Sequence, residues 1–232
     1  MSRLWVMACK NGARSDVRVT GLASSAGLVD ASVASIRANH PDDDILVVDS
    51  DSPDKTYMPR VAKFGAEVLD IANRQYSQGA HRLAVERYRD YDHYALIADS
   101  VWLNAPVPDD VLTVRWFSSR RHPWGVDQHG VDLAEWGVPH LNAMGVPYTG
   151  DYLGVLGPYL FCDRDLVDRL GRIGFFDIPV TNKWEQCAME RVGGIVLGHL
   201  GEDVTRSLQG EHIHHFDDYD ESVVTKINAG RF

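Results

Sequence analysis

Basic residues are scarce in this sequence, and long apolar runs are absent. Its 232 residues include 23 Lys and Arg against 33 Asp and Glu, a formal net charge of -10. Phosphate contacts need clustered basic side chains, so this charge argues against a general duplex-DNA binder but not against a local basic pocket. No apolar stretch approaches the length of a membrane span. The apolar run from Leu4 to Cys9 is too short for a signal peptide, and Lys10 follows it, which predicts a cytoplasmic protein.

Cysteine is also scarce. Cys9, Cys162 and Cys187 lie far apart, in neither a disulfide-framework nor a zinc-ribbon spacing. Free thiols in a reducing compartment are therefore expected. Hydrophobic residues make up 44% of the chain and charged residues 24%, which is typical of a soluble globular protein with a sizeable core.

The hydrophobic pattern of the first hundred residues predicts alternating strands and helices. The expected strands span 4–8, 45–48, 67–71 and 93–97, and the expected helices span 28–38, 58–64 and 81–91. Right-handed crossovers make this an α/β fold with a mostly parallel central sheet flanked by helices. Ligands gather at the carboxyl ends of such strands, where Asp49, Asp51 and Asp99 fall.

The second half of the chain has weaker periodicity. Residues 106–152 are rich in Pro, Gly, His and Trp, and we expect irregular, ligand-facing structure there. A strand at 159–162 and helices at 166–170 and 184–192 are expected after it, followed by the tail 210–232, which carries "EHIHHF".

The segment "DDDILVVDSDSPDKT" ends an apolar strand with Asp49-Ser50-Asp51 and has several interpretations. Haloacid dehalogenase-type phosphatases place Asp-x-Asp after such a strand, as nucleophile and acid/base. Pro53 stands where that motif normally has Thr or Val. Alternatively, Asp, Ser and Pro simply form a turn that caps the next helix.

The same segment, "ILVVDSDSPDKT", resembles the "VVDDGSTDGT" stretch of glycosyltransferases with the GT-A fold, especially the large inverting family 2 that includes cellulose- and chitin-synthase-like enzymes. The resemblance continues in order through "YALIADSVWL", "GPYLFCDRDLVDRLGRIGFFD", "KWEQCAMERVGG" and "HIHHF", and so covers most of the chain. It implies a single GT-A-like domain over 1–232, with a nucleotide-sugar-binding half at 1–103 and an acceptor and catalytic half at 104–232.

The resemblance also implies an activity and a site. The activity would be inverting transfer of a sugar from a nucleotide-diphosphate sugar, a UDP-sugar by default, to an unknown acceptor hydroxyl. Mn²⁺ or Mg²⁺ would be held by Asp99 with His215 and His214, and Glu185 would be the general base. The residues implied around the donor are Ala8, Asp49, Asp51, Arg82 and Asp99. The metal motif is reduced to one carboxylate, since Val101 replaces its second Asp, so a catalytically silent nucleotide-sugar-binding protein is the remaining alternative.

Aromatic and charged residues in the second half have two interpretations each. Trp116, Trp124 and Trp136 either stack on sugar rings or bases, or cover the sheet. The basic patch Arg120-Arg121-His122 suits a phosphate, from the donor or from an acceptor. Glu190 is expected to be a solvated helix residue.

Overall fold

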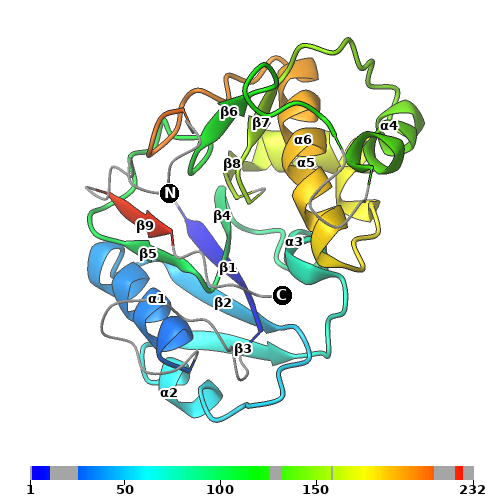
Figure 1. Ribbon diagram of the computed structural model, residues 1–232. Helices are drawn as coiled ribbons and strands as arrows, with labels where there is room; N and C mark the ends of the chain where they lie inside the picture. Colours follow the sequence, from blue (N-terminus) through cyan, green and yellow to red (C-terminus); the bar gives the residue numbers. More distant parts are fainter. Residues whose placement is uncertain (1, 11–25, 126–131, 158, 212–222, 227–232) are drawn as a thin grey trace.

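The structure is a computed structural model that describes residues 2–10, 26–125, 132–157, 159–211 and 223–226 (Figure 1). His212, His214 and His215 fall outside these residues, so the predicted histidine ligands are not placed. Among the helices that are described, none is long and apolar enough to cross a membrane. The three cysteines form no disulfide.

The central sheet has five strands in the order β3-β2-β1-β4-β8 (Figure 1). Strand β1 (Arg3–Cys9) lies in the middle and pairs in parallel with β2 (Asp44–Asp49) and with β4 (His93–Ala98). Strand β3 (Ala66–Asp70) extends the parallel sheet beyond β2, and β8 (Leu160–Asp163) pairs with β4 in the antiparallel direction. The chain therefore leaves β1 toward the β3 edge of the sheet and returns to the other side of β1 at β4, which makes the boundary between β1 and β4 a topological switch point.

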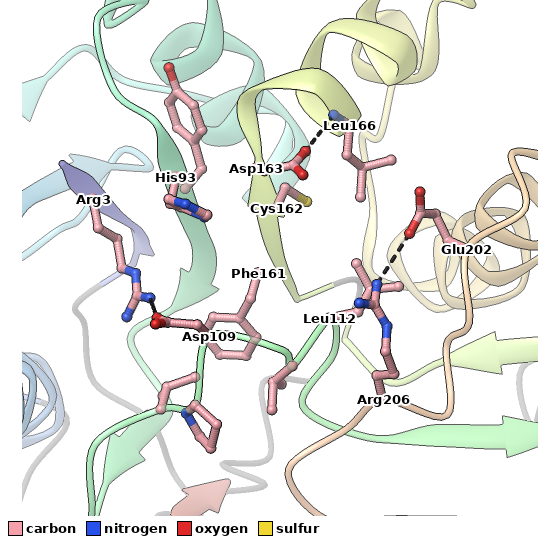
Figure 2. Close-up of a pocket in the computed structure, with 14 residues that line it drawn as sticks. Arg3, His93, Asp109, Leu112, Phe161, Cys162, Asp163, Leu166, Glu202 and Arg206 are labelled. Carbon is pink, nitrogen blue, oxygen red and sulfur yellow. Dashed lines mark hydrogen bonds and ion pairs between the residues drawn. The ribbon is translucent and has the colours of Figure 1, made fainter. Parts of the chain in front are cut away.

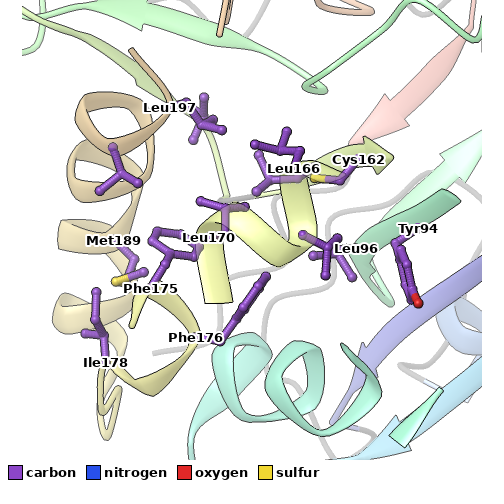
Figure 3. Packing of buried hydrophobic residues seen from close by; sticks show 14 of the residues in the cluster. Tyr94, Leu96, Cys162, Leu166, Leu170, Phe175, Phe176, Ile178, Met189 and Leu197 are labelled. Atoms are coloured by element: carbon purple, nitrogen blue, oxygen red, sulfur yellow. The ribbon is translucent and has the colours of Figure 1, made fainter. Parts of the chain in front are cut away.

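Both faces of the sheet are buried, because its strands are apolar on both sides. Trp5 and Met7 point toward α1 (Ala26–Asn39) and α2 (Met58–Ala62). Leu4 and Val6 point to the opposite face, which is covered by α3 (Tyr76–Arg87), α5 (Arg164–Arg172) and α6 (Lys183–His199). Figure 3 shows the second core, where Leu96 of β4 lies beside α5 and Phe176 of the short 3-10 helix η1 (Phe175–Asp177), and the α6 side chains Met189 and Leu197 pack on the other side of α5.

Smaller elements complete the second half. Strand β6 (Trp116–Ser118) pairs with β7 (Leu153–Val155), and β5 (Val101–Leu103) pairs with β9 (Val224–Lys226), both in the antiparallel direction. Helix α4 (Leu133–Ala143) lies beside α6 (Figure 1). Helix α6 in turn lies directly on β7, where a Cβ added to Gly194 would be only 2.0 Å from the Leu153 carbonyl oxygen.

The mixed α/β fold with a mostly parallel sheet is confirmed, and the predicted strands of its first half lie where they were expected. The helix expected at 81–91 is wrong in position, because α3 begins at Tyr76 and ends at Arg87. The irregular structure expected over 106–152 is also wrong in part, because β6 and α4 lie there. The division into a donor half and an acceptor half stays a prediction.

Candidate functional site

Three strand ends meet at the switch point. The last two residues of β1 are bonded to the chain that follows its neighbouring strands. The Ser50 amide donates to the Cys9 carbonyl (2.7 Å), and the Asp99 amide donates to the Ala8 carbonyl (3.0 Å). The Lys10 amide donates to Asp99 Oδ2 at 3.1 Å. These bonds bring Ala8, Asp49 and Asp99 together at the carboxyl edge of the sheet, where ligands bind in folds of this kind, and their role as ligand-binding residues stays a prediction.

Asp49 is completely buried and already bonded within the chain. Its Oδ1 accepts from the Ser52 amide at 2.9 Å, and its Oδ2 accepts from the Tyr57 hydroxyl at 2.7 Å. Burial, then the nearby Cys9, then the bond to Asp49 raise the pKa of Tyr57, so its hydroxyl stays protonated and continues to donate. Asp49 thus fixes the loop from Ser50 to Tyr57. Because Asp49 is completely buried, direct contact with a donor, or nucleophilic attack on a phosphate, requires this loop to move.

The rim around Asp49 contains strained backbone. Asp51, Ala72 and Tyr76 have positive φ angles of 60°, 48° and 50°, a region that side chains other than glycine rarely adopt. Asp51 and Ala72 lie in the loops that follow β2 and β3, and Tyr76 is the first residue of α3. Asn73 ties these loops together, because its Nδ2 donates to Ser50 Oγ at 3.1 Å and to the Tyr76 carbonyl at 2.6 Å. Strain of this kind persists where the surroundings fix the backbone, and it clusters at ligand sites.

Two predicted donor residues lie farther out. Asp51 is exposed on the rim, with Oδ2 3.7 Å from Arg74 Nε. Arg82 lies in the middle of α3, and its guanidinium pairs with Glu86 (2.9 Å) and with Asp177 of η1 (3.3 Å). The structure therefore places Asp51 at the edge where the strand ends meet, whereas Arg82 is directed at the junction of α3 and η1.

The described residues do not by themselves form a metal site. Asp99 is completely buried and contributes one carboxylate, whose Oδ2 accepts from the Lys10 amide. No group of three His, Cys, Asp or Glu side chains suited to a metal is found within the ranges that the structure describes. A divalent ion bridging a diphosphate is held by one or two carboxylates plus phosphate oxygens and water, so the metal stays a prediction that rests on Asp99.

Glu185 is a capping residue of α6. The N-cap Asn182 accepts from the amides of Trp184 and Glu185, and Glu185 Oε2 accepts from the amide (2.5 Å) and hydroxyl (2.9 Å) of Thr181. This reciprocal arrangement resembles a capping box. Burial lowers the pKa of His140 on α4, and the charge of Glu185 opposes that shift. Glu185 therefore faces α4, and its role as general base stays a prediction.

A row of polar residues on α6, not predicted from the sequence, lies beside the first turn of α3. At 3.6 residues per turn, Lys183, Gln186, Cys187 and Glu190 share one side of the helix, and Glu185 lies about 200° around the axis from Lys183. The Ser77 hydroxyl of α3 donates to Gln186 Oε1 at 3.1 Å. The sequence signal for this row is the N-cap residue Asn182, followed by polar residues three, four and seven positions after Lys183.

The prediction that Glu190 is solvated is wrong. Its side chain is 18% exposed, and its Oε1 accepts from the Gly157 amide at 3.0 Å. Gly157 has a φ of 72°, and a Cβ there would lie 2.3 Å from the ring of Tyr159. Tyr159 in turn is hydrogen-bonded to Ser100, the residue after Asp99. The Glu190 carboxylate is therefore partly buried because it accepts the hydrogen bond from the Gly157 amide in the turn before β8.

Electrostatics at this row favour a charged lysine. Burial disfavours the Lys183 ammonium, but Cys187, Glu190, Tyr159 and Tyr76 together outweigh it and hold the pKa of Lys183 above its ordinary value. Lys183 is therefore cationic at neutral pH. Burial raises the pKa of Tyr159, which keeps that hydroxyl protonated.

The three tryptophans are partly buried against the second core. The ring of Trp124 lies 5.9 Å from that of Tyr148 and 5.8 Å from that of Tyr152, and Trp136 lies 4.6 Å from His140. Trp116 belongs to β6. These contacts favour the covering role, since the rings pack on one another.

The predicted basic patch is partly neutralised. Arg120 lies 3.8 Å from Asp151, and Arg121 lies 3.5 Å from Glu211. The ring of His122 lies 5.2 Å from that of Phe117. Two of the three residues thus have carboxylates beside them, which weakens their suitability for a phosphate.

A cavity of about 90 Å³ lies at the other end of the sheet, beside the first residues of β1 and β4 (Figure 2). Its charged side chains pair with one another, Arg3 with Asp109 at 2.6 Å and Arg206 with Glu202 at 3.2 Å. Because parallel strands place their carboxyl ends at the opposite edge, this cavity is separate from the site at the switch point.

No family model and no curated protein matches the sequence. Many solved structures resemble the fold, including the following two. An active-site mutant of LgtC, a glycosyltransferase, aligns at 12% identity over 83% of this chain and 71% of that chain, with a TM-score of 0.41. A mycobacterial protein aligns at 20% identity over 87% of this chain and 76% of that chain, with a TM-score of 0.34. Both TM-scores are below 0.5, so neither likeness assigns an activity to this chain.

Proposed function

We propose that this chain is a glycosyltransferase, which moves a sugar from a nucleotide-diphosphate sugar, by default a UDP-sugar, to an acceptor hydroxyl. One observation carries the proposal: Asp49 ends β2 and Asp99 follows β4, the two strands that flank β1, and main-chain bonds hold both beside the end of β1. Nucleotides bind at this position in open α/β sheets. The strained rim at Asp51, Ala72 and Tyr76 supports a ligand site there.

Sugar transfer makes two demands on such a site. Negative charge develops on the leaving diphosphate and must be stabilised, and the acceptor hydroxyl must lose a proton. Asp99 would hold a divalent ion for the first task, and that ion would supply charge to the diphosphate when bound. Glu185 would take the proton, in which case the acceptor would approach from the side of α4. A base opposite the leaving group implies inversion at the anomeric carbon.

The geometry bears differently on the two alternatives, a phosphatase and a silent nucleotide-sugar-binding protein. A phosphatase needs a nucleophilic aspartate that the substrate can reach, yet Asp49 is completely buried and holds its own loop through both carboxylate oxygens. The geometry therefore does not favour the phosphatase. A silent nucleotide-sugar-binding protein would use the same site without the proton acceptor, and only turnover distinguishes it from the enzyme.

The test is a thermal-shift and calorimetric screen of nucleotides and nucleotide sugars, with Mn²⁺ and with EDTA, followed by a donor-hydrolysis assay. A ligand that binds only the native state raises its apparent stability. Binding plus hydrolysis supports the transferase, whereas binding alone supports the silent protein. Phosphate release from a simple phosphomonoester would support the phosphatase. If no nucleotide or nucleotide sugar binds under either condition, the proposal fails.

A further inference from the structure

We propose that Lys183 is the cation that receives the diphosphate of the donor, and that Glu190 positions it. This inference rests on the proposed function, and it assigns to α6 a role in leaving-group stabilisation that the sequence did not suggest.

The direction of β8 explains how α6 reaches the strand ends. Because β8 runs antiparallel to β4, with Leu160 opposite Leu96, its first residues lie beside the last residues of β4. Tyr159 immediately precedes β8 and is hydrogen-bonded to Ser100, next to Asp99. On α6, Glu190 accepts from the Gly157 amide, two residues before Tyr159, and Lys183 lies on the same side of the helix as Glu190. This side of α6 therefore lies toward the start of β8, and Tyr159 is also among the groups that raise the pKa of Lys183.

Contacts from α3 fix the same end of α6. The Ser77–Gln186 bond joins the first turns of the two helices, and Ser77 follows Tyr76, one of the strained rim residues. Lys183, one turn before Gln186 on the same side of α6, thus belongs to the helix end that is tied to the rim of the proposed nucleoside site. A diphosphate that extends from that site toward the sugar would pass this position.

Other basic residues of this edge are already engaged. Lys55 is bonded to Asp70 at the end of β3, and Arg74 lies 3.7 Å from Asp51. Among the residues that the structure describes, none forms a hydrogen bond or ion pair with the Lys183 ammonium, which is nevertheless half-buried. A partly desolvated cation without a bonded counter-ion interacts strongly with an incoming anion.

Glu190 acts on Lys183 rather than on the donor. Its Oε1 is engaged by the Gly157 amide at 3.0 Å and its Oε2 lies 3.5 Å from Arg191 Nη1. It lies two helical turns beyond Lys183 on the same side of α6. Its negative charge therefore favours the protonated, cationic form of Lys183.

The proposed chemistry is a single displacement. The bond between the anomeric carbon and the diphosphate oxygen breaks, and its electron pair stays on that oxygen as negative charge. The acceptor oxygen forms the new bond to the anomeric carbon, and its proton passes to the general base. Lys183 lowers the barrier because its charge is already in place where the negative charge develops.

The experiment measures binding of UDP, UMP and uridine in EDTA by calorimetry, for the parental protein and for Lys183→Met. We expect parental affinity to rise with phosphate charge, from uridine to UDP. Lys183→Met should lose at least about tenfold in UDP affinity, since hydrogen bonds to charged groups contribute about 1.5–3 kcal/mol, and it should keep its uridine affinity. Lys183→Arg should retain most of the UDP affinity. Lys63→Met, at an exposed lysine after α2, is the matched control and should bind UDP like the parent.

Glu190→Gln should lower UDP affinity by less than Lys183→Met does and leave uridine binding unchanged. If Lys183→Met does not fold, Lys183→Gln provides the same test. The affinities of the parental protein for uridine, UMP and UDP in EDTA also test whether phosphate charge strengthens binding. Parental protein that binds UDP no more tightly than uridine in EDTA, or a folded Met variant with parental UDP affinity, would overturn the role of Lys183. Failure of every nucleotide to bind the parent instead contradicts the proposed function.

Discussion

The Tyr57 hydroxyl donates a 2.7 Å hydrogen bond to Asp49 Oδ2, and neither residue is exposed to solvent. A buried carboxylate is tolerated only when its oxygens are bonded, and here one bond comes from the loop that follows β2 and the other from Tyr57, immediately before α2. The strand end and the start of α2 are therefore coupled through a single carboxylate, which makes Asp49 a positioning residue for the rim of the proposed donor site.

Tyr57→Phe should lower the free energy of unfolding by about 1–3 kcal/mol, because it leaves Asp49 Oδ2 buried without its donor. Urea unfolding monitored by circular dichroism measures the effect. Tyr91→Phe is the matched control, since the Tyr91 hydroxyl also bonds a carboxylate, Asp44, at 2.7 Å but in an exposed setting. That control should cost less than about 0.5 kcal/mol. Equal losses in the two variants would contradict the coupling.

Asp99→Asn should abolish any effect of Mn²⁺ on UDP affinity while uridine remains bound. The amide keeps the size of the side chain and an acceptor for the Lys10 amide, but it removes the negative charge that a divalent ion requires. Calorimetry with and without Mn²⁺ measures this, with Asp70→Asn at the end of β3 as control. Mn²⁺ dependence that survives in Asp99→Asn would place the metal on other residues.

Glu185→Gln should slow sugar transfer by roughly 10²–10⁴-fold with donor binding nearly intact, if Glu185 is the general base. Glutamine is also an accepted capping-box residue, so the helix should keep its N-terminus. Initial rates and donor affinity, measured on the same preparation, separate the two effects. Transfer at the parental rate would reject Glu185 as base and make Asp177 or a retaining mechanism the better hypothesis.

Asn182→Ala provides the control for the capping role. It removes the side chain that accepts from Trp184 and Glu185, so the free energy of unfolding should fall by about 1 kcal/mol. The transfer rate of the folded protein should change far less than in Glu185→Gln. A comparable loss of rate in both variants would mean that the helix end, rather than the carboxylate, matters.

Stability should decline in mild acid because of His81. Burial lowers its pKa to about 4, and Nε2 lies 3.2 Å from the Ile97 carbonyl oxygen, to which it donates. The unfolded chain, with a histidine pKa near 6.5, binds a proton that the folded state does not, so the free energy of unfolding falls as pH drops from about 6.5 toward 4, by on the order of 3 kcal/mol.

His81→Gln keeps a side-chain donor for Ile97 and removes the titration. Urea unfolding between pH 7 and pH 4 should therefore show a shallower decline for this variant than for the parent. The exposed His199→Gln is the matched control and should keep the parental decline. A parental slope in His81→Gln would show that other groups cause the acid sensitivity.

The sheet was predictable because its central strands are apolar on both faces and end in turn residues. The four parallel strands, and the meeting of Asp49 with Asp99, follow from that pattern. Helix α4 was missed because Gly137 and Pro139 are poor helix formers. Gly137 is present because a Cβ there would lie 2.4 Å from the Trp124 ring, a tertiary cause that no local pattern reveals. Asp132 and Glu135 carried the capping signal that would have located the helix.

The positions of Asp49 and Asp99 in the proposed site were predictable from the sequence, and those of Lys183 and Glu190 on α6 were not. Asp49 and Asp99 follow apolar strands, whereas Lys183 and Glu190 look like ordinary charged residues of an exposed helix. Their burial depends on Tyr159 and Gly157, which reach the helix only because β8 reverses direction at the edge of the sheet. The start of α3 was missed for a related reason: Tyr76 adopts a backbone conformation that sequence propensities disfavour.

Helix α6 carries Lys183 on one side and Glu185 on the other, within one rigid rod that rests on β7 at Gly194. A 17-residue helix bends little, so these two side chains keep a constant separation whatever the surrounding loops do. Insertions or substitutions in α4 and its flanking loops would then change which acceptor reaches Glu185 without changing the geometry around Lys183. Such an arrangement allows one face of a helix to diversify while the other stays fixed.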